Sequence, residues 1–230
     1  DIHYSEDELD ALQEKVNSVN EFADIPDLLA QMECGECKSV IVPLIRQARI
    51  MGQKYDVVVT NPPYMGASNM NAKLNEFIKL NYTDYKSDFF SAFVVKCTLL
   101  AKPYGFLGFL TPYVWMFIQS YENMREYLYD NATIQTLIQF EYSAFEEATV
   151  PICTFTFRNY CVNNYYGGYF NLTNFRGGME VQRVKTLEAI NNSACGYYYA
   201  QSTYHFEELP GRPLAYWISS PSGTDSANNV

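Results

Sequence analysis

Residues 55–64 read YDVVVTNPPY, in which a β-branched run passes directly into an asparagine, two prolines and a tyrosine. A continuous apolar run of this length, followed at once by turn-forming residues, is typical of a strand buried on both faces of a parallel sheet. Each proline fixes φ at about −65° and lacks an N–H, and the residue before it is pushed into an extended conformation. The pattern predicts a buried strand over 55–60 and a stiff loop at its carboxyl end, where open α/β sheets bind their ligands.

The segments around this strand alternate between helical and strand-like patterns. Upstream, we expect a helix over 5–22 that begins at a capping box of Ser5 and Glu8, and a second over 39–51 that Gly52 ends. Downstream, the patterns predict helices over 72–80, 87–101, 113–129 and 181–190, and strands over 106–110, 134–140 and 152–157. Because consecutive strands joined by a helix form a crossover, the fold class is α/β, a sheet with helices on both faces.

Composition limits the class of protein. The chain has 230 residues, of which 48% are hydrophobic, enough for one good-sized core or for one domain and part of a second. The formal net charge of −10 repels polyanions, so any contact with nucleic acid must come from a local patch. Neither a membrane-spanning apolar run nor a dense cysteine framework is present in the sequence, which predicts a cytoplasmic protein with no membrane partner.

The loop over 61–64 is the candidate catalytic feature. The Asn61 side-chain oxygen and the Pro62 carbonyl can accept hydrogen bonds from one planar amino group, while the Tyr64 ring lies against the flat system that carries it. Two converging acceptors stabilise the positive charge that grows on such a nitrogen as it attacks an electrophile, and Pro63 keeps the loop stiff. A plain rigid turn is the alternative, which the position after a strand and before a crossover disfavours.

The loop and several further segments resemble a known family. YDVVVTNPPY is similar to motif IV of the class I, S-adenosylmethionine-dependent amino-methyltransferases, in which adenine-N6 DNA methyltransferases carry Asn/Asp-Pro-Pro and an aromatic residue. Residues 87–116 resemble the part of that family that follows, and FEEATVPICTFTF, residues 145–157, resembles its motif VIII. With YMGASNMNAKL and GRPLAYW, the similarity covers residues 20–218 and is greatest to the PglX-type enzymes of BREX and phage-growth-limitation systems.

This resemblance implies a fold, an activity and a set of site residues. The fold is a partial Rossmann-like methyltransferase sheet, and the full-length enzyme transfers a methyl group from S-adenosylmethionine to an adenine flipped out of double-stranded DNA, in a prokaryotic restriction-modification or phage-defence system. Other phage-defence proteins are expected partners, and no metal is expected. Phe93 falls where an aromatic contacts the cofactor's adenine, and Phe145 falls where an aromatic stacks on the flipped base. The implied catalytic residues are Asn61, Pro62, Pro63 and Tyr64, and Tyr64 also stacks on the base.

The sequence departs from the family before the loop. A glycine-rich turn of the type Asp-Pro-x-x-Gly-x-Gly begins the family's cofactor site, but only Gly35 and Gly52 precede Asn61, and neither lies in such a context. We therefore interpret the chain as a fragment that lacks most of the cofactor half. It is expected to bind S-adenosylmethionine weakly or not at all, and the edge of its sheet is expected to be open, covered or paired with another copy.

Composition shifts along the chain predict four parts. Residues 1–52 form a helical segment that leads into the core, and residues 53–160 form the catalytic half. Residues 161–218, rich in Asn, Gly and aromatics, form a C-terminal α+β extension toward target recognition, and residues 219–230 form a flexible tail.

Other residues carry weaker signals. The single CxxC over 34–37 fits a plain loop between helices better than a zinc or redox site. Asp88 either helps to position Phe93 or the cofactor, or stabilises a helix N-terminus by its charge. Side chains that could touch phosphate, but fit a solvated helix face better, are Arg176, Arg183 and Lys185.

Two alternatives to DNA adenine methylation stay open. The same loop occurs in enzymes that methylate a protein glutamine amide or a guanine N2 of ribosomal RNA. The chain could also be a non-catalytic module that binds nucleic acid or a partner protein, which the net negative charge and the missing glycine turn support. The long extension after residue 160 resembles the approach to a target-recognition region and favours DNA.

Overall fold

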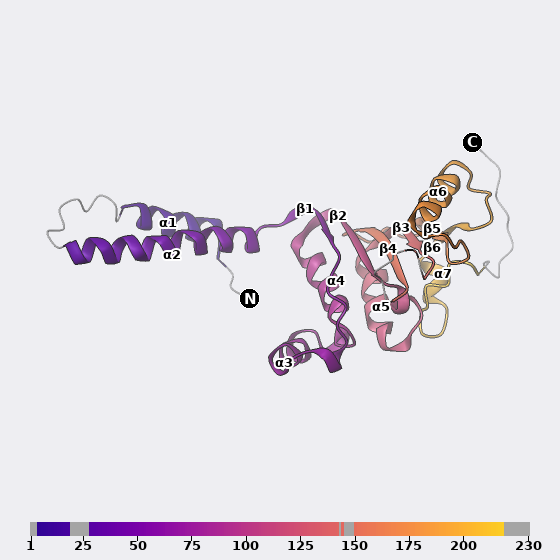
Figure 1. The fold of residues 1–230 in the computed structure, drawn as a ribbon, viewed down its shortest axis with the longest axis horizontal. Helices are drawn as coiled ribbons and strands as arrows, with labels where there is room; N and C mark the ends of the chain where they lie inside the picture. Colours follow the sequence, from indigo (N-terminus) through magenta and orange to yellow (C-terminus); the bar gives the residue numbers. More distant parts are fainter. Residues whose placement is uncertain (1–3, 19–27, 143, 145–149, 219–230) are drawn as a thin grey trace. The chain divides into compact units, whose positions relative to one another are not determined.

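A computed structural model describes residues 4–18, 28–142, 144 and 150–218, with backbone alone over 28–35 (Figure 1). The chain divides into two compact units, Asp1–Lys54 and Tyr55–Val230, which are described separately. In the part of the chain that the structure describes, no helix combines the length and apolar character needed to cross a bilayer.

The first unit is a pair of helices, α1 (Glu6–Ser18) and α2 (Leu28–Gly52). The predicted capping box is confirmed, because the Ser5 N–H donates to Glu8 Oε2 at 2.8 Å and the Glu8 N–H donates to Ser5 Oγ at 3.2 Å. Near the end of α2, Arg49 forms ion pairs with Glu6 at 2.7 Å and Asp10 at 2.6 Å. The two helices therefore lie antiparallel, and the part of the predicted helix over 5–22 that follows Ser18 lies outside the described residues.

The second helix is longer than the sequence predicts. It was expected over 39–51 but begins at Leu28 and continues through Gly35 and Pro43. The prediction that the CxxC over 34–37 lies in a loop was wrong, since those residues are helical. Glycine and proline suggest a break, yet a helix of this length keeps hydrogen bonds on both sides of one proline. Among the described residues, no group of three or more His, Cys, Asp or Glu could hold a metal.

The second unit is built on a mixed six-stranded sheet of order β1-β2-β4-β3-β5-β6. The first and second strands pair in parallel, as do β3 and β5, and the other neighbours are antiparallel. Its strands are β1 (Tyr55–Thr60), β2 (Ala101–Pro112), β3 (Thr133–Gln139), β4 (Ile152–Arg158), β5 (Tyr166–Asn171) and β6 (Tyr198–Ser202). Its α-helices are α3 (Ala72–Asn81), α4 (Phe89–Leu100), α5 (Glu122–Asn131), α6 (Gly178–Asn191) and α7 (Tyr204–Glu207).

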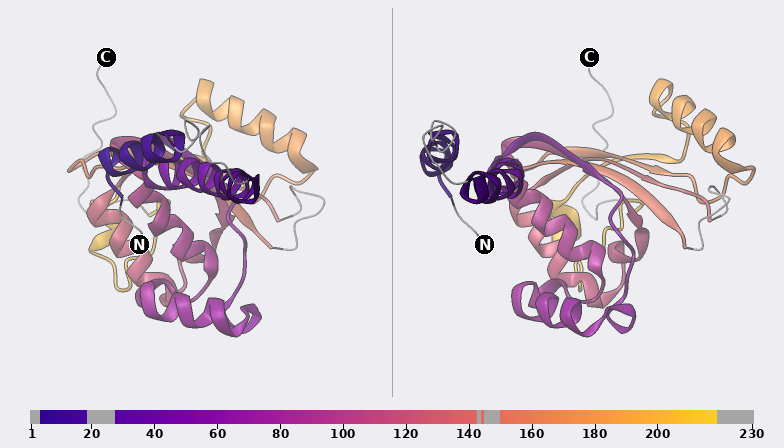
Figure 2. Two further views of the ribbon diagram at one scale, coloured as in Figure 1. Left: turned by 90° about the vertical axis from the view of Figure 1, so that its left-hand side faces the viewer. Right: turned by 60° about the vertical axis from the view of Figure 1, so that its left-hand side comes forward.

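Helices cover both faces of this sheet, as predicted. The larger core lies on the face of α4, α5 and α7, where the Phe109 ring stacks on Phe155 and Phe157. Consecutive strand residues point to opposite faces, so Tyr169 belongs to this core while Phe170 belongs to a second, smaller one. The second core lies under α6, on the other side of the sheet in the right-hand view of Figure 2.

The prediction that the first strand is buried on both faces was wrong. Val58 packs against the larger core, but the side chains of Val57 and Val59 are 57% and 74% exposed. The strand pairs with β2 alone, so it forms an edge of the sheet in the described chain. A run of apolar strand residues indicates burial, but here only one face of β1 packs against other parts of the described protein.

The segment over 113–129 was predicted as one helix and is broken. It forms two 3₁₀ turns, Tyr113–Met116 and Gln119–Tyr121, before α5 begins. Buried Arg125 donates Nη1 to the carbonyls of Trp115 and Ile118, at 2.7 and 2.8 Å. These carbonyls are therefore taken by the side chain of Arg125, from later in the same segment, and a helical pattern of apolar residues does not reveal such a contact.

The segment after residue 160 extends the same sheet. The parallel pairing of β3 with β5 runs from Thr136 opposite Gly168 to Gln139 opposite Asn171, and β6 pairs outside β5. The GRPLAYW segment returns to α5, where Arg125 also donates to the carbonyls of Gly211 and Arg212. One guanidinium thus ties the extension to the core, while the division into catalytic half and extension stays a prediction.

Replacing Arg125 with alanine should lower the free energy of unfolding by about 3 kcal/mol or more. The change leaves buried carbonyls without donors, and each unsatisfied group costs roughly 1–3 kcal/mol. Arg125→Lys should restore little of the lost stability, because one ammonium group cannot reach both the carbonyls over 115–118 and those over 211–212. Urea denaturation measures both, with Arg183→Ala as the control, since Arg183 forms an exposed ion pair with Glu180. Equal losses of unfolding free energy for Arg125→Ala and Arg183→Ala would contradict this structural role of Arg125.

Candidate functional site

The loop over 61–64 lies where the sequence predicts it, at the carboxyl end of β1. Thr60, the last residue of β1, pairs with Phe109 of the parallel strand β2, so the loop leaves the sheet beside the end of β2. Pro62 is buried, whereas Asn61, Pro63 and Tyr64 are exposed. The buried proline anchors the loop against the protein and the polar side chain of Asn61 faces solvent.

The Tyr64 hydroxyl links two acceptors. It lies 2.8 Å from Asn61 Oδ1 and 3.1 Å from the carbonyl oxygen of Leu110, on β2. A hydroxyl has one hydrogen, so these two oxygens share a single donor. An amide oxygen carries two lone pairs, and Asn61 Oδ1 therefore keeps an acceptor position for a further donor. Among the described residues, the Asn61 amide is engaged by the Tyr64 side chain and not by the main chain.

Aromatic neighbours hold the Tyr64 ring. The ring stands edge-on to Phe90, with the centroids 6.4 Å apart, and Phe90 in turn stacks on Tyr121 at 5.4 Å. Burial, with a smaller contribution from the nearby Cys153, raises the pKa of Tyr64 to about 12. The Tyr64 hydroxyl therefore stays protonated, and remains a donor, throughout the neutral range.

Asp88 connects the loop to α4. Its Oδ1 accepts from the N–H of Phe90 at 3.1 Å, so Asp88 is the N-cap of α4, in line with the predicted place at a helix N-terminus. The same oxygen accepts from the N–H of Met65 at 2.9 Å, and the Phe89 N–H donates to the Met65 carbonyl at 2.9 Å. No pattern in the sequence indicates the contact with Met65, because it joins residues 23 positions apart in the chain.

The other predicted aromatics are not brought together with the loop by the described structure. Phe93 lies on α4, half-buried, with its ring 4.8 Å from that of Phe89. Phe145 lies outside the described residues. The roles of Phe93 toward a cofactor and of Phe145 toward a base therefore stay predictions.

Sequence reasoning missed a buried polar group near the loop. The Trp115 indole N–H donates to Thr111 Oγ1 at 3.2 Å, and the Cys153 sulfur lies 3.8 Å from the same oxygen. Burial raises the pKa of Cys153 to about 12, so this thiol is a structural group and not a nucleophile. Cysteine within an apolar strand pattern gives no sequence signal that separates these roles.

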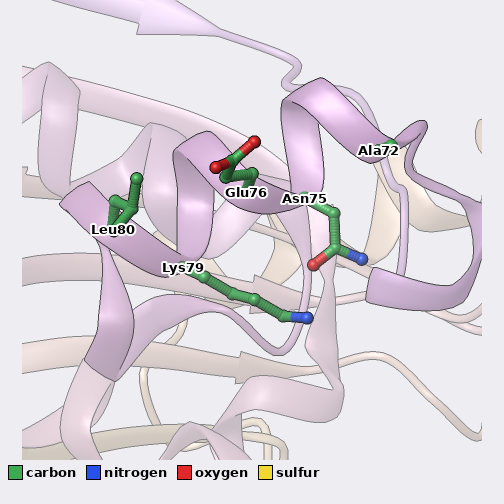
Figure 3. Close-up of a pocket in the computed structure, with 5 residues that line it drawn as sticks. All are labelled: Ala72, Asn75, Glu76, Lys79 and Leu80. Atoms are coloured by element: carbon green, nitrogen blue, oxygen red, sulfur yellow. The ribbon is translucent and has the colours of Figure 1, made fainter.

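A pocket lies on the surface of α3 (Figure 3). All of its lining residues come from this one helix, and none belongs to the predicted site. The lining residues are Ala72, Asn75, Glu76, Lys79 and Leu80.

With this geometry in view, comparison with known proteins identifies the family. Residues 2–145 match the Eco57I restriction-modification methylase family. The chain belongs to this family. It is 35% identical over 184 residues to the adenine-specific methyltransferase BrxX of Escherichia coli O9:H4 (strain HS). This aligned region is 80% of this chain and 15% of that protein. It is 32% identical over 179 residues to the adenine-specific methyltransferase PglX of Lacticaseibacillus casei (strain Zhang). The aligned region is 76% of this chain and 15% of that protein.

Two consequences follow for this methylase-family chain. The resemblance found in the sequence is confirmed, and the chain spans about 15% of the length of these two curated relatives.

Two solved structures share its fold. One is a DrdV–DNA complex, with a TM-score of 0.54 and 14% identity over 79% of this chain and 20% of that one. The other is a type I restriction-modification system, with a TM-score of 0.53 and 16% identity over 79% of this chain and 41% of that one. The α/β fold class is thereby confirmed.

The Tyr64 phenol should ionise at about pH 12, well above free tyrosine at about 10. The difference in phenolate absorbance between the methylase chain and its Tyr64→Phe variant, followed against pH, isolates this one group. Because the folded pKa is raised, the stabilisation linked to protonated Tyr64 is complete below about pH 10 and is lost as pH rises through about 12. A difference curve centred near pH 10 would show that the ring is not held against the protein.

Proposed function

We propose that this chain carries the target-amine site of an adenine-N6 DNA methyltransferase. The intact protein would transfer a methyl group from S-adenosylmethionine to an adenine flipped out of double-stranded DNA, in the cytoplasm of a prokaryote, as part of a phage-defence or restriction-modification system. The observation that carries the proposal is the exposed Asn61 on a proline-stiffened loop at the carboxyl end of β1, with Tyr64 beside it. The names of the relatives BrxX and PglX support it.

The loop accounts for the chemistry at the amine. Asn61 Oδ1 and the Pro62 carbonyl accept the two amino hydrogens, so the nitrogen lone pair points away from both acceptors. As the nitrogen attacks, its growing positive charge is stabilised by these fixed dipoles, and the proton can leave afterwards without a prior general base. The methyl group itself comes from the sulfonium of the cofactor.

Stacking accounts for binding of the base. An aromatic ring against a nucleobase contributes about 1–3 kcal/mol, which helps to offset the few kcal/mol needed to unstack and unpair it. Tyr64 supplies one such ring here, and Phe145 is the proposed second. The net charge of −10 places the phosphate contacts in a local patch or elsewhere in the intact protein.

Asn61→Ala in the intact protein should lower kcat for methylation of an adenine-containing duplex by about 100-fold or more, with a smaller effect on KM for DNA. The reason is the loss of an acceptor whose interaction strengthens in the transition state. Transfer of a labelled methyl group to DNA measures this, with Asn69→Ala as a matched control at a second exposed asparagine. Comparable rates for Asn61→Ala and the unmutated protein would remove Asn61 from the mechanism.

The same assay separates the alternatives. Methylation of a release-factor glutamine or of ribosomal RNA in place of DNA would assign the loop to another planar amine. Transfer to none of the three substrates would favour a non-catalytic binding module.

The isolated chain should bind S-adenosylmethionine weakly or not at all. Its residues fit only part of a cofactor site, because Phe93 is half-buried beside Phe89 and no glycine-rich turn precedes Asn61. Isothermal calorimetry of this chain, next to the intact protein, measures the difference. Equally tight binding to both would show that residues 1–230 contain the whole site.

A further inference from the structure

The N-terminus of α4 holds the far end of the amine-binding loop. We propose that Asp88 is a positioning residue for this loop: by fixing Met65 it sets the place of Tyr64 and, through it, the orientation of Asn61. The inference rests on the proposed function for its catalytic consequence, and on the hydrogen bonds of Asp88 and Tyr64 for the geometry.

Main-chain hydrogen bonds hold the loop at its two ends, because its two prolines, Pro62 and Pro63, have no N–H to donate. Upstream, the chain is fixed where Thr60 pairs with Phe109. Downstream, both main-chain groups of Met65 are engaged, the N–H by Asp88 Oδ1 and the carbonyl by the Phe89 N–H.

Helix capping alone does not explain Asp88. An N-cap needs one bond to the first turn of its own helix, and the bond from the Phe90 N–H supplies it. Asn71 shows this simpler case at α3, where its side chain accepts from the Leu74 N–H at 2.9 Å. Asp88 additionally accepts from Met65, which lies 23 residues earlier in the chain, and that bond belongs to the loop.

The fixed position is passed on to the site by direct contacts. Met65 follows Tyr64 immediately, and Phe90, capped by Asp88, meets the Tyr64 ring edge-on. The Tyr64 hydroxyl then reaches Asn61 Oδ1. A shift of Met65 therefore moves both the stacking ring and the acceptor, and a misplacement of about 1 Å can cost as much as 100-fold in rate.

Two substitutions separate the loop contact from the cap. Asp88→Ser keeps a good N-cap residue but shortens the side chain, so the bond to Phe90 can persist while the reach to Met65 is lost. Asp88→Asn keeps both length and an acceptor oxygen. Asn71→Ala removes a cap of the neighbouring helix α3 and serves as the control for lost capping.

The experiment uses the intact protein with two readouts. The first is hydrogen exchange of the main chain over residues 61–66, with thermal melting as a check on folding. The second is methyl transfer to adenine-containing duplex DNA. We expect faster exchange over 61–66 and a roughly tenfold or larger fall in kcat for Asp88→Ser, values close to the unmutated protein for Asp88→Asn, and neither change for Asn71→Ala.

The outcomes distinguish this inference from the proposed function. Unchanged exchange over 61–66 in Asp88→Ser, or an equal change in Asn71→Ala, overturns the positioning role. Faster exchange over 61–66 in Asp88→Ser with an unchanged kcat would show that the position of the loop set by Asp88 does not matter for methyl transfer. If the unmutated protein methylates no substrate, the proposed function fails, and the exchange data still decide whether Asp88 places the loop.

Discussion

The absence of main-chain donors at Pro62 and Pro63 is the constraint on which the site depends. A loop without these N–H groups offers acceptors to a ligand without competing donors, but it must be held from outside. The protein does this with the ladder between β1 and β2 on one side and with α4 on the other. The crossover helix thus has a second role, because the same residue that begins it also fixes the loop.

The first strand lies at an edge of the sheet in the described residues. Within them it pairs with β2 alone, and its Val57 and Val59 side chains face away from the larger core. Exposed apolar residues on an edge strand promote association, so this surface is consistent with a sheet that continues in the intact protein. Under the proposed function, the chain supplies acceptors for an amine, and most of the cofactor site belongs to other parts of the intact protein.

Local patterns predicted the elements near the site well. The strand over 55–60, the helix that starts at Ala72 and the crossover through α4 all agree with their sequence periodicity. The errors arose where side-chain contacts decide: Arg125 takes carbonyls that a helix over 113–129 would use, and the burial of a strand depends on what covers it. Asn61 and Tyr64 could be selected from sequence because prolines constrain them locally, whereas the bond between Asp88 and Met65 exists only in three dimensions.

The Tyr64 hydroxyl explains how a site can be held ready without being blocked. Its one hydrogen serves both Asn61 Oδ1 and the Leu110 carbonyl, so neither acceptor is fully satisfied. When an amine donates to Asn61, the hydroxyl hydrogen can turn wholly to Leu110, and the number of hydrogen bonds does not fall. Exchange of partners then costs little free energy, while the raised pKa of Tyr64 keeps the donor present at neutral pH. A phenylalanine at this position would stack on a base but could not make this exchange, which assigns the hydroxyl a purpose separate from that of the ring.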